Sequence, residues 1–185
     1  MSYSGQTSDS APVDTHRPLQ RAGSAHPRAS ARMKDEMTAI RRADQMDRDA
    51  IVAIDDIATA GNHDRRVLLE AALESGHCLV LDAGNGIEGF VVTVPKAFFG
   101  RDFVELLIVD RARRRLGVGR RLLQAAVRFA STSRVFTSTN HSNSSMRALL
   151  DREGWSVSGE LGGLDDGDPE IVYFIDRSAL VDATV

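Results

Sequence analysis

The chain has 185 residues, of which 42% are hydrophobic and 5% aromatic, so it can form one domain of about 150 residues with a core but not a second full domain. A formal net charge of −3 does not favour binding to nucleic acid or acidic membranes, and no run of about 18 apolar residues is present to span a bilayer. A single cysteine, Cys78, excludes an internal disulfide and a thiolate-rich metal site. Because the start MSYSGQTSDS lacks the apolar segment of a secretory signal, we expect a soluble, cytoplasmic protein.

Residues 1–34 differ in composition from the rest of the chain. Ser, Ala, Pro, Gly, His and Arg dominate, and Val13 and Leu19 are the large aliphatic residues. This apolar surface is too small to offset the entropy lost when a chain becomes ordered. We therefore predict a disordered tail over residues 1–34, with a role as an electrostatic arm left open, and a single domain over residues 35–185.

Regular periodicity begins after this tail. Alternating residues predict a short strand at 38–42, and apolar residues at helical spacing predict helices at 45–58 and 62–75. The second of these helices is expected to bury Val67, Leu68, Ala71 and Ala72. Strands are predicted at 78–81 and 87–94, joined through the hairpin sequence Asp82-Ala-Gly-Asn-Gly86 and followed by a loop between Pro95 and Gly100.

Residues 103–130 combine an apolar strand, an arginine-rich loop ending in Gly117-Val118-Gly119, and an amphipathic helix. A strand that leads through a glycine loop into a helix directs unpaired backbone N–H groups and the positive end of the helix dipole at one point. Such a point binds anions, above all phosphates. Leu122 stands where a dinucleotide fingerprint needs its third glycine, and a Walker ending is also missing. The loop therefore indicates a phosphate-bearing cofactor, with a tight turn under a solvated arginine face as the alternative.

The remainder of the chain adds strands and one helix. A strand is predicted at 134–139, a helix at 146–152 after a run of polar capping residues, and two further strands at 155–160 and 170–175. No internal repeat is evident. This mixed order of elements around a sheet indicates an α+β (mixed α/β) domain.

Two motifs resemble those of the GNAT superfamily of acyl-CoA-dependent N-acetyltransferases. The loop Arg114-Arg-Leu-Gly117-Val-Gly119 matches that family's R/Q-x-x-G-x-G/A loop, and the stretch from Asn143 to Trp155 is similar to its N-x-x-A-x-x-L-Y-x-K-x-G-F element. The preceding VELLIVDRARR resembles the family's fourth strand, and the resemblance covers roughly residues 38–175. It implies a central mixed, mostly antiparallel sheet of about 6–7 strands flanked by about four helices.

The resemblance also implies acetyl-CoA as a co-substrate and no metal. The backbone of residues 114–120 would hold the pyrophosphate, and two strand residues would contact the pantetheine arm where two parallel strands splay apart. Asn143 would help to hold the same arm, with a plain helix cap as its alternative role. The cofactor-binding residues implied are Ile108, Val109, Arg114, Arg115, Leu116, Gly117, Val118, Gly119, Arg120 and Asn143.

Glu105 is the candidate general base, because the acceptor amine must lose a proton before or while it attacks the thioester. It lies in an otherwise apolar strand, at a position where the family often carries an acidic residue, and an outward-facing solvated residue is the alternative. The family's usual acid is a tyrosine, but Leu150 stands at that position here. Tyr173 lies in the last strand without support from a motif, so water or another group would have to protonate the thiolate, unless positioning and cofactor electrostatics suffice.

The predicted function is transfer of acetyl from acetyl-CoA to a primary amine of a small molecule or peptide, by direct attack on the thioester. The alternative, which Leu150 leaves open, is a non-catalytic acyl-CoA-binding sensor or interaction module of the same fold. The acidic residues 164–170 could attract a cationic amine or form a solvated turn, and Phe98, Phe99 and Phe103 could line an acceptor cleft or the core. No nucleic-acid or membrane partner is expected, and a homodimer through exposed sheet edges is left open.

Overall fold

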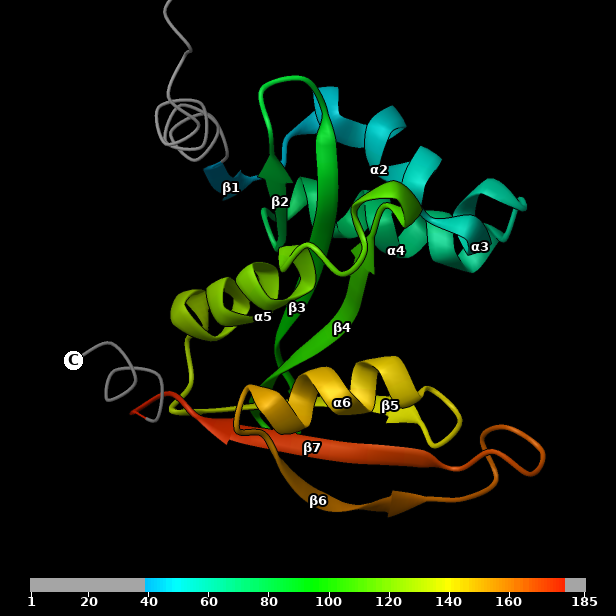
Figure 1. The fold of residues 1–185 in the computed structure, drawn as a ribbon, viewed down its shortest axis with the longest axis vertical. Helices are drawn as coiled ribbons and strands as arrows, with labels where there is room; N and C mark the ends of the chain where they lie inside the picture. Colours follow the sequence, from blue (N-terminus) through cyan, green and yellow to red (C-terminus); the bar gives the residue numbers. More distant parts are fainter. Residues whose placement is uncertain (1–38, 179–185) are drawn as a thin grey trace, which may run out of the picture.

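The computed structural model describes residues 39–178, so the predicted tail over residues 1–34 lies outside the described residues. Seven strands form one sheet in the order β1-β2-β3-β4-β5-β7-β6 (Figure 1). Neighbouring strands are antiparallel, except for the parallel pair β4–β5, which confirms the predicted mixed, mostly antiparallel sheet. The strands are β1 (Ala39–Arg42), β2 (Cys78–Asp82), β3 (Ile87–Phe98), β4 (Arg101–Val109), β5 (Arg134–Asn140), β6 (Ser156–Leu161) and β7 (Glu170–Asp176).

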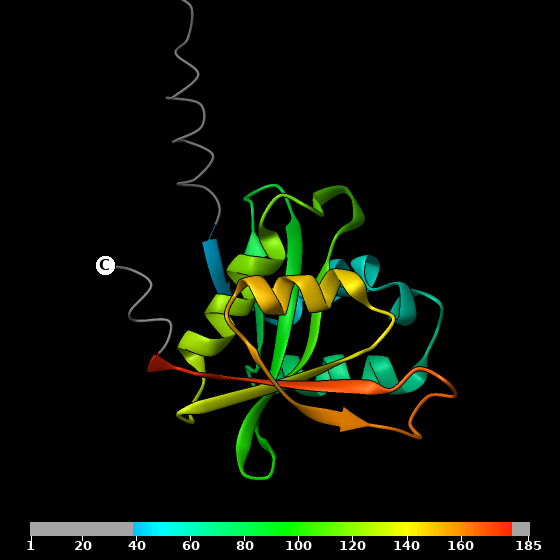
Figure 2. The same cartoon turned by 60° about the horizontal axis from the view of Figure 1, so that its bottom comes forward.

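Helices cover both faces of the sheet (Figures 1 and 2). Side chains of α5 and α6 join the core on one face, and side chains of α2, α3 and α4 join the core on the other. No helix in the described part of the chain is long and apolar enough to cross a membrane. The helical segments are η1 (Gln45–Asp47), α2 (Arg48–Ile54), α3 (Asp56–Thr59), α4 (His63–Glu74), η2 (Arg111–Arg113), α5 (Val118–Phe129) and α6 (Ser144–Arg152), where η marks a 3-10 helix.

The single helix predicted at 45–58 is divided into η1, α2 and α3. Asp55 has an extended backbone between α2 and α3, and its carboxylate accepts hydrogen bonds from the N–H groups of Ile57 and Ala58. An aspartate that caps a new helix start competes with continuation of the previous helix. The interruption separates the apolar residues of this stretch: Ile51 and Ala58 are buried, whereas Met46 is 91% exposed and Ile57 47% exposed.

Helix α4 has the predicted bounds and the predicted Asn62 cap, but the predicted apolar face is correct at Leu68 and Ala72 and wrong at Val67 and Ala71. Leu69, Ala72 and Leu73 are buried, whereas Val67 is 52% exposed. Several sets of apolar residues in this helix satisfy helical spacing, and the angle at which the helix meets the sheet selects one of them.

The loop expected between Pro95 and Gly100 is instead the end of a long β-hairpin, which projects from the sheet in Figure 2. Phe98 pairs with Arg101, so only Phe99 and Gly100 form the turn. Both turn residues have positive φ, 48° and 76°, which is typical of the tight turns that suit the twist of paired strands. The register shifts between Val94 and Phe98, which accommodates a proline that cannot donate a ladder hydrogen bond.

The feature that positions the site is the short parallel pairing of β4 and β5. Residues 102–104 of β4 pair with residues 135–137 of β5, and from Glu105 onward β4 has no partner on that side within residues 39–178. The hydroxyl of Thr137 donates to the carbonyl of Val104 at 2.9 Å, at the last paired position. Strand β5 continues alongside β7 to Asn140, so the sheet splits where β4 and β5 part.

Candidate functional site

The free edge of β4 beyond the split presents main-chain groups. The N–H of Asp110 donates to the carbonyl of Glu88 in β3 at 3.0 Å, and hydrogen-bonding residues alternate along an antiparallel pair. Ile108 therefore directs its main chain toward β3, whereas Leu107 and Val109 direct theirs toward the open edge. Of the two residues predicted to contact pantetheine, Val109 therefore presents main-chain groups at the open edge and Ile108 does not; Leu107, which was not predicted although a period of two indicates it, shares that edge.

The loop after β4 leads to a helix start without a side-chain cap. Gly117 is the N-cap of α5, with φ 83° and ψ 0°, and no side-chain cap hydrogen bond forms there among residues 39–178. The first helical hydrogen bond runs from the N–H of Arg121 to the carbonyl of Gly117 at 3.1 Å. The N–H groups of Val118, Gly119 and Arg120 precede that bond and carry the positive end of the helix dipole. This arrangement fits a pyrophosphate.

The arginines around this loop have different partners. Arg114 donates from Nε to the carbonyl of Val109 at 3.3 Å, which holds the loop against the free edge of β4. Arg115 is exposed, has a positive φ of 65°, and has no side-chain partner among residues 39–178. Arg115 is therefore the arginine of the motif whose guanidinium is available to a phosphate. Three others form ion pairs with carboxylates of other elements: Arg111 with Asp56 (2.8 Å), Arg113 with Glu88 (3.4 Å) and Arg120 with Glu153 (3.1 Å).

Two glycines allow the start of α5 to lie close to its neighbours. A Cβ on Gly119 would lie 3.4 Å from Leu149 and 3.5 Å from Val109, so this glycine faces α6 and β4. A Cβ on Gly89 in β3 would lie 2.7 Å from the carbonyl oxygen of Ile108, closer than a Cβ can approach. Gly89 was not among the predicted site residues, although an isolated glycine within a predicted strand is a signal of close backbone approach.

Asn143 is the N-cap of α6, as its alternative role predicted. Its side-chain oxygen accepts a hydrogen bond from the N–H of Met146 at 3.1 Å, and the residue is exposed. The side-chain NH₂ group has no partner in the described part of the chain, so capping does not occupy the whole amide. The same side chain can cap the helix and donate to a ligand.

Glu105 lies at the point where the sheet splits. In the β3–β4 ladder Val92 pairs with Leu106 and Thr93 with Val104, so Glu105 is the extra residue of a β-bulge. It is exposed and is the first residue beyond the stretch paired with β5. Bulges re-aim a side chain and interrupt pairing, which suits a residue that must reach a substrate.

Neither residue 150, where the family has its tyrosine, nor Tyr173 can act as the acid that protonates the thiolate. Leu150 is fully buried in the core beneath α6, and Tyr173, the only tyrosine within residues 39–178, is 1% exposed in the same cluster. The family's tyrosine position therefore contributes to packing in this chain.

Most of the acidic residues between β6 and β7 have partners. Asp165 accepts a hydrogen bond from the side chain of Asn140 at 2.7 Å, and Asp168 accepts two from Ser142, at 2.9 and 2.6 Å. The hydrogen bonds from Ser142 lower the pKa of Asp168. Asp166 is exposed and has no side-chain partner among the residues described, so it is the carboxylate of this loop that remains available.

The three phenylalanines that could have lined a cleft gather at the turn end of the β3–β4 hairpin. The ring of Phe98 lies 5.4 Å from that of Phe103 and 5.0 Å from that of Phe99, measured between centroids. Phe136 of β5 joins them, at 4.9 Å from Phe98. They form an aromatic cluster in which Phe99 is 93% exposed.

Comparison with known proteins gives one family. A model of the acetyltransferase (GNAT) domain matches residues 74–156. The chain is similar to an acetyltransferase of the GNAT family from Bacillus cereus, with 35% identity, 76% of this chain and 97% of that chain covered, and a TM-score of 0.70.

Other solved structures share the fold at lower identity. An acetyltransferase from Salmonella typhimurium with its cofactor acetyl-CoA is 21% identical, with 76% of this chain and 94% of that chain covered and a TM-score of 0.61. An N-acetyltransferase from Staphylococcus aureus is 19% identical, with 76% and 98% covered and a TM-score of 0.60. No curated protein matches the chain.

Proposed function

This chain belongs to the GNAT family of acyl-CoA-dependent acetyltransferases, and we propose that it transfers acetyl from acetyl-CoA to a primary amine of a small molecule or peptide. Family membership establishes acetyl transfer and the co-substrate, and the acceptor is the proposal. The observation that supports it is the exposed carboxylate of Glu105 at the split between β4 and β5. The uncapped start of α5 lies beyond the end of the same strand.

We assign the cofactor contacts to the groups that are left without partners. The N–H groups of Val118, Gly119 and Arg120 would hold the pyrophosphate, with the guanidinium of Arg115 beside them. The main chain of Leu107 and the N–H of Val109, whose carbonyl accepts from Arg114, would bind the pantetheine arm at the edge of β4, and the side-chain NH₂ group of Asn143 would donate to the same arm. When bound, acetyl-CoA supplies the thioester carbonyl carbon that the amine attacks.

Glu105 would act as the general base. An alkylamine is protonated at neutral pH, because its pKa is about 10, and only the neutral amine is a nucleophile. An exposed carboxylate at the mouth of the split can accept that proton directly or through a water molecule. Because Leu150 and Tyr173 are both buried in the core, water would protonate the departing thiolate.

A cationic acceptor is supported by the carboxylates that follow β6. Asp166 has no partner within residues 39–178, and its loop is tied to the turn before α6 through Asp168 and Ser142. A negative group near the site raises the local concentration of a protonated amine.

Association into a homodimer is proposed through β6. This strand pairs with β7 on one side, and all of its residues are exposed. An exposed edge strand is a template for pairing with a second chain. Light scattering during size-exclusion chromatography should give twice the monomer mass, and a monomer across the concentration range would contradict the proposal.

The test of the function is release of thiol from acetyl-CoA across a panel of amines, which should include polyamines, amino-acid amides and lysine-containing peptides. We expect turnover on at least one primary amine and none on the corresponding alcohols. Binding of CoA without turnover on any amine would instead favour the acyl-CoA-binding module, in agreement with the missing tyrosine at Leu150.

A further inference from the structure

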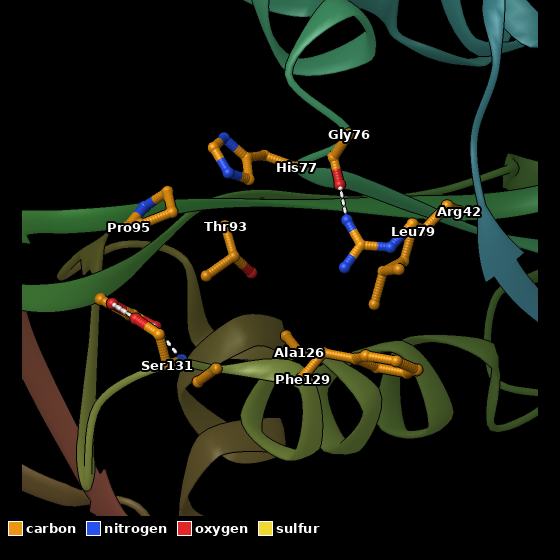
Figure 3. A pocket seen from close by; sticks show the side chains of 11 residues that line it. Arg42, Gly76, His77, Leu79, Thr93, Pro95, Ala126, Phe129 and Ser131 are labelled. Atoms are coloured by element: carbon orange, nitrogen blue, oxygen red, sulfur yellow. Dashed lines mark hydrogen bonds between the residues drawn. The ribbon is translucent and has the colours of Figure 1, made fainter.

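A cavity of about 210 Å³ lies between the sheet and the C-terminal half of α5 (Figure 3). It is lined by residues from β1, β2, β3 and β4, from the last turn of α5, and from the loops before β2 and after α5. The loop that fits the pyrophosphate precedes the other end of this helix. The cavity is therefore separate from the site described above.

The cavity exists because the helix presents small residues at this level. Ala126 and Ala130 face the sheet and are 1% and 7% exposed, so the helix does not fill the space opposite Leu79. Phe129 is 61% exposed and forms part of the rim. The result is an apolar floor with an open mouth.

Polar groups without partners line the same space. Arg42 donates from Nη1 to the carbonyl of Gly76 at 2.6 Å, which fixes its guanidinium at the cavity. The other nitrogens of that guanidinium, the imidazole of His77 and the hydroxyl of Thr93 have no hydrogen-bond partner among the described residues. A cation and a hydroxyl above apolar side chains are the groups that recognise a carboxylate with an apolar body.

Asp102 is the one carboxylate that lines the cavity, and it does not prevent an anion from binding near Arg42. Asp102 is 1% exposed and accepts hydrogen bonds from the main chain and hydroxyl of Ser131 and from the N–H of Lys96. These neutral donors stabilise the ionised carboxylate in place. Ser131 lies at the end of the cavity away from Arg42 in Figure 3, so the anionic and cationic ends are apart.

We propose that this cavity binds a small monocarboxylate, with the carboxylate on Arg42 and Thr93 and the apolar body against Leu79 and Ala126. At about 30 Å³ for each water in the liquid, the volume accommodates about seven heavy atoms. An aliphatic acid of five carbons has this size. The site is independent of the acetyl acceptor.

The probe is 3-methylbutanoate, titrated into the full-length protein by calorimetry, with 3-methylbutanamide as its uncharged counterpart. We expect one carboxylate per chain, with the amide at least about tenfold weaker, because it lacks the charge-assisted hydrogen bond to Arg42. Saturating CoA should leave this affinity unchanged. Equal binding of acid and amide, no binding of either, or displacement by CoA would overturn the proposal.

Substitutions of lining residues test whether the carboxylate binds in this cavity. Arg42→Gln should weaken the carboxylate by about tenfold or more, whereas Arg128→Gln, which changes an exposed arginine of α5 outside the lining, should not. Thr93→Val keeps the shape of the side chain, removes the hydroxyl, and should also weaken binding. Unchanged affinity in both Arg42→Gln and Thr93→Val would reject the cavity as the site.

Discussion

Glu105 is the single side chain on which the proposed chemistry depends. Glu105→Gln should lower kcat by about 100-fold or more and leave the Kd for CoA unchanged, because a general base acts on the amine and not on cofactor binding. The acidic limb of the pH–rate profile, along which activity rises as a carboxylate loses its proton, should disappear. Steady-state kinetics across pH and a CoA titration measure both effects.

Glu160→Gln is the control, because it removes another exposed carboxylate from edge strand β6 and should retain activity. Survival of both the rate and the pH profile in Glu105→Gln would exclude Glu105 as the base.

Substitution of Gly117 tests the proposed pyrophosphate site at the start of α5. Its φ of 83° is costly for a residue with a Cβ, although no atom lies within 4 Å of the position that a Cβ would take. Gly117→Ala should therefore lower the free energy of unfolding by about 1–2 kcal/mol through the backbone alone, and should weaken CoA binding as the loop shifts. Gly159→Ala, in a strand and equally free of contacts, is the control, and a Kd for CoA that is unchanged in Gly117→Ala would contradict the assignment.

Among the elements, helix α6 carries Leu150 at the position where the family has a tyrosine. Leu150 is fully buried, so Leu150→Tyr should not increase kcat. The larger side chain should lower the free energy of unfolding by about 1–3 kcal/mol, because a packed core resists added volume. Thermal or denaturant unfolding measures the stability, with the volume-conserving Leu150→Met as the control. A rise in kcat would show that a hydroxyl at this position reaches the site.

Some elements have a local signal in the sequence, and others have an ambiguous one. The strand, loop and helix around Gly117 were predictable, because each part has its own local signal. The buried face of α4 was not, because the apolar set containing Val67 and the one containing Leu69 both satisfy helical spacing. Contact with the sheet selected the second set.

For the whole molecule, buried carboxylates make stability depend on pH. The side-chain hydrogen bond from Arg41 lowers the pKa of Asp47. Burial alone would raise the pKa of Asp102, but hydrogen bonds from Ser131 and Lys96 outweigh it, so that pKa also lies below the ordinary Asp value of 3.8. A lowered pKa in the folded state contributes stability that is present above pH 3.8 and is lost as pH falls below it.

We therefore expect the free energy of unfolding to decrease below about pH 4. Asp102→Asn should destabilise the protein at pH 7 and reduce this dependence, whereas Asp166→Asn, at an exposed carboxylate, should do neither. Denaturant titrations from pH 2 to 7 measure the free energy of unfolding of each variant. An acid transition identical in Asp102→Asn and the unaltered protein would show that Asp102 does not contribute.

The extent of the domain is also testable on the whole molecule. We propose that the folded domain lies within residues 35–185, because residues 1–34 have too little apolar surface to add to a core. Deletion of residues 1–34 should leave the Tm and the Kd for CoA unchanged. A large loss of either would show that these residues pack against the domain.

The sequence by itself determined the order of the elements, the strand, loop and helix unit with its glycine at 117, and the second motif beginning at Asn143. Periodicity, capping and positive φ are local properties, so a single chain segment carries them. Only the tertiary structure decided that the sheet splits at Glu105, that Leu107 shares the free edge with Val109, that Leu150 is core, and that most loop arginines already have partners. Strand register, burial and ion pairing join residues far apart in the chain, and no local pattern specifies which of them meet.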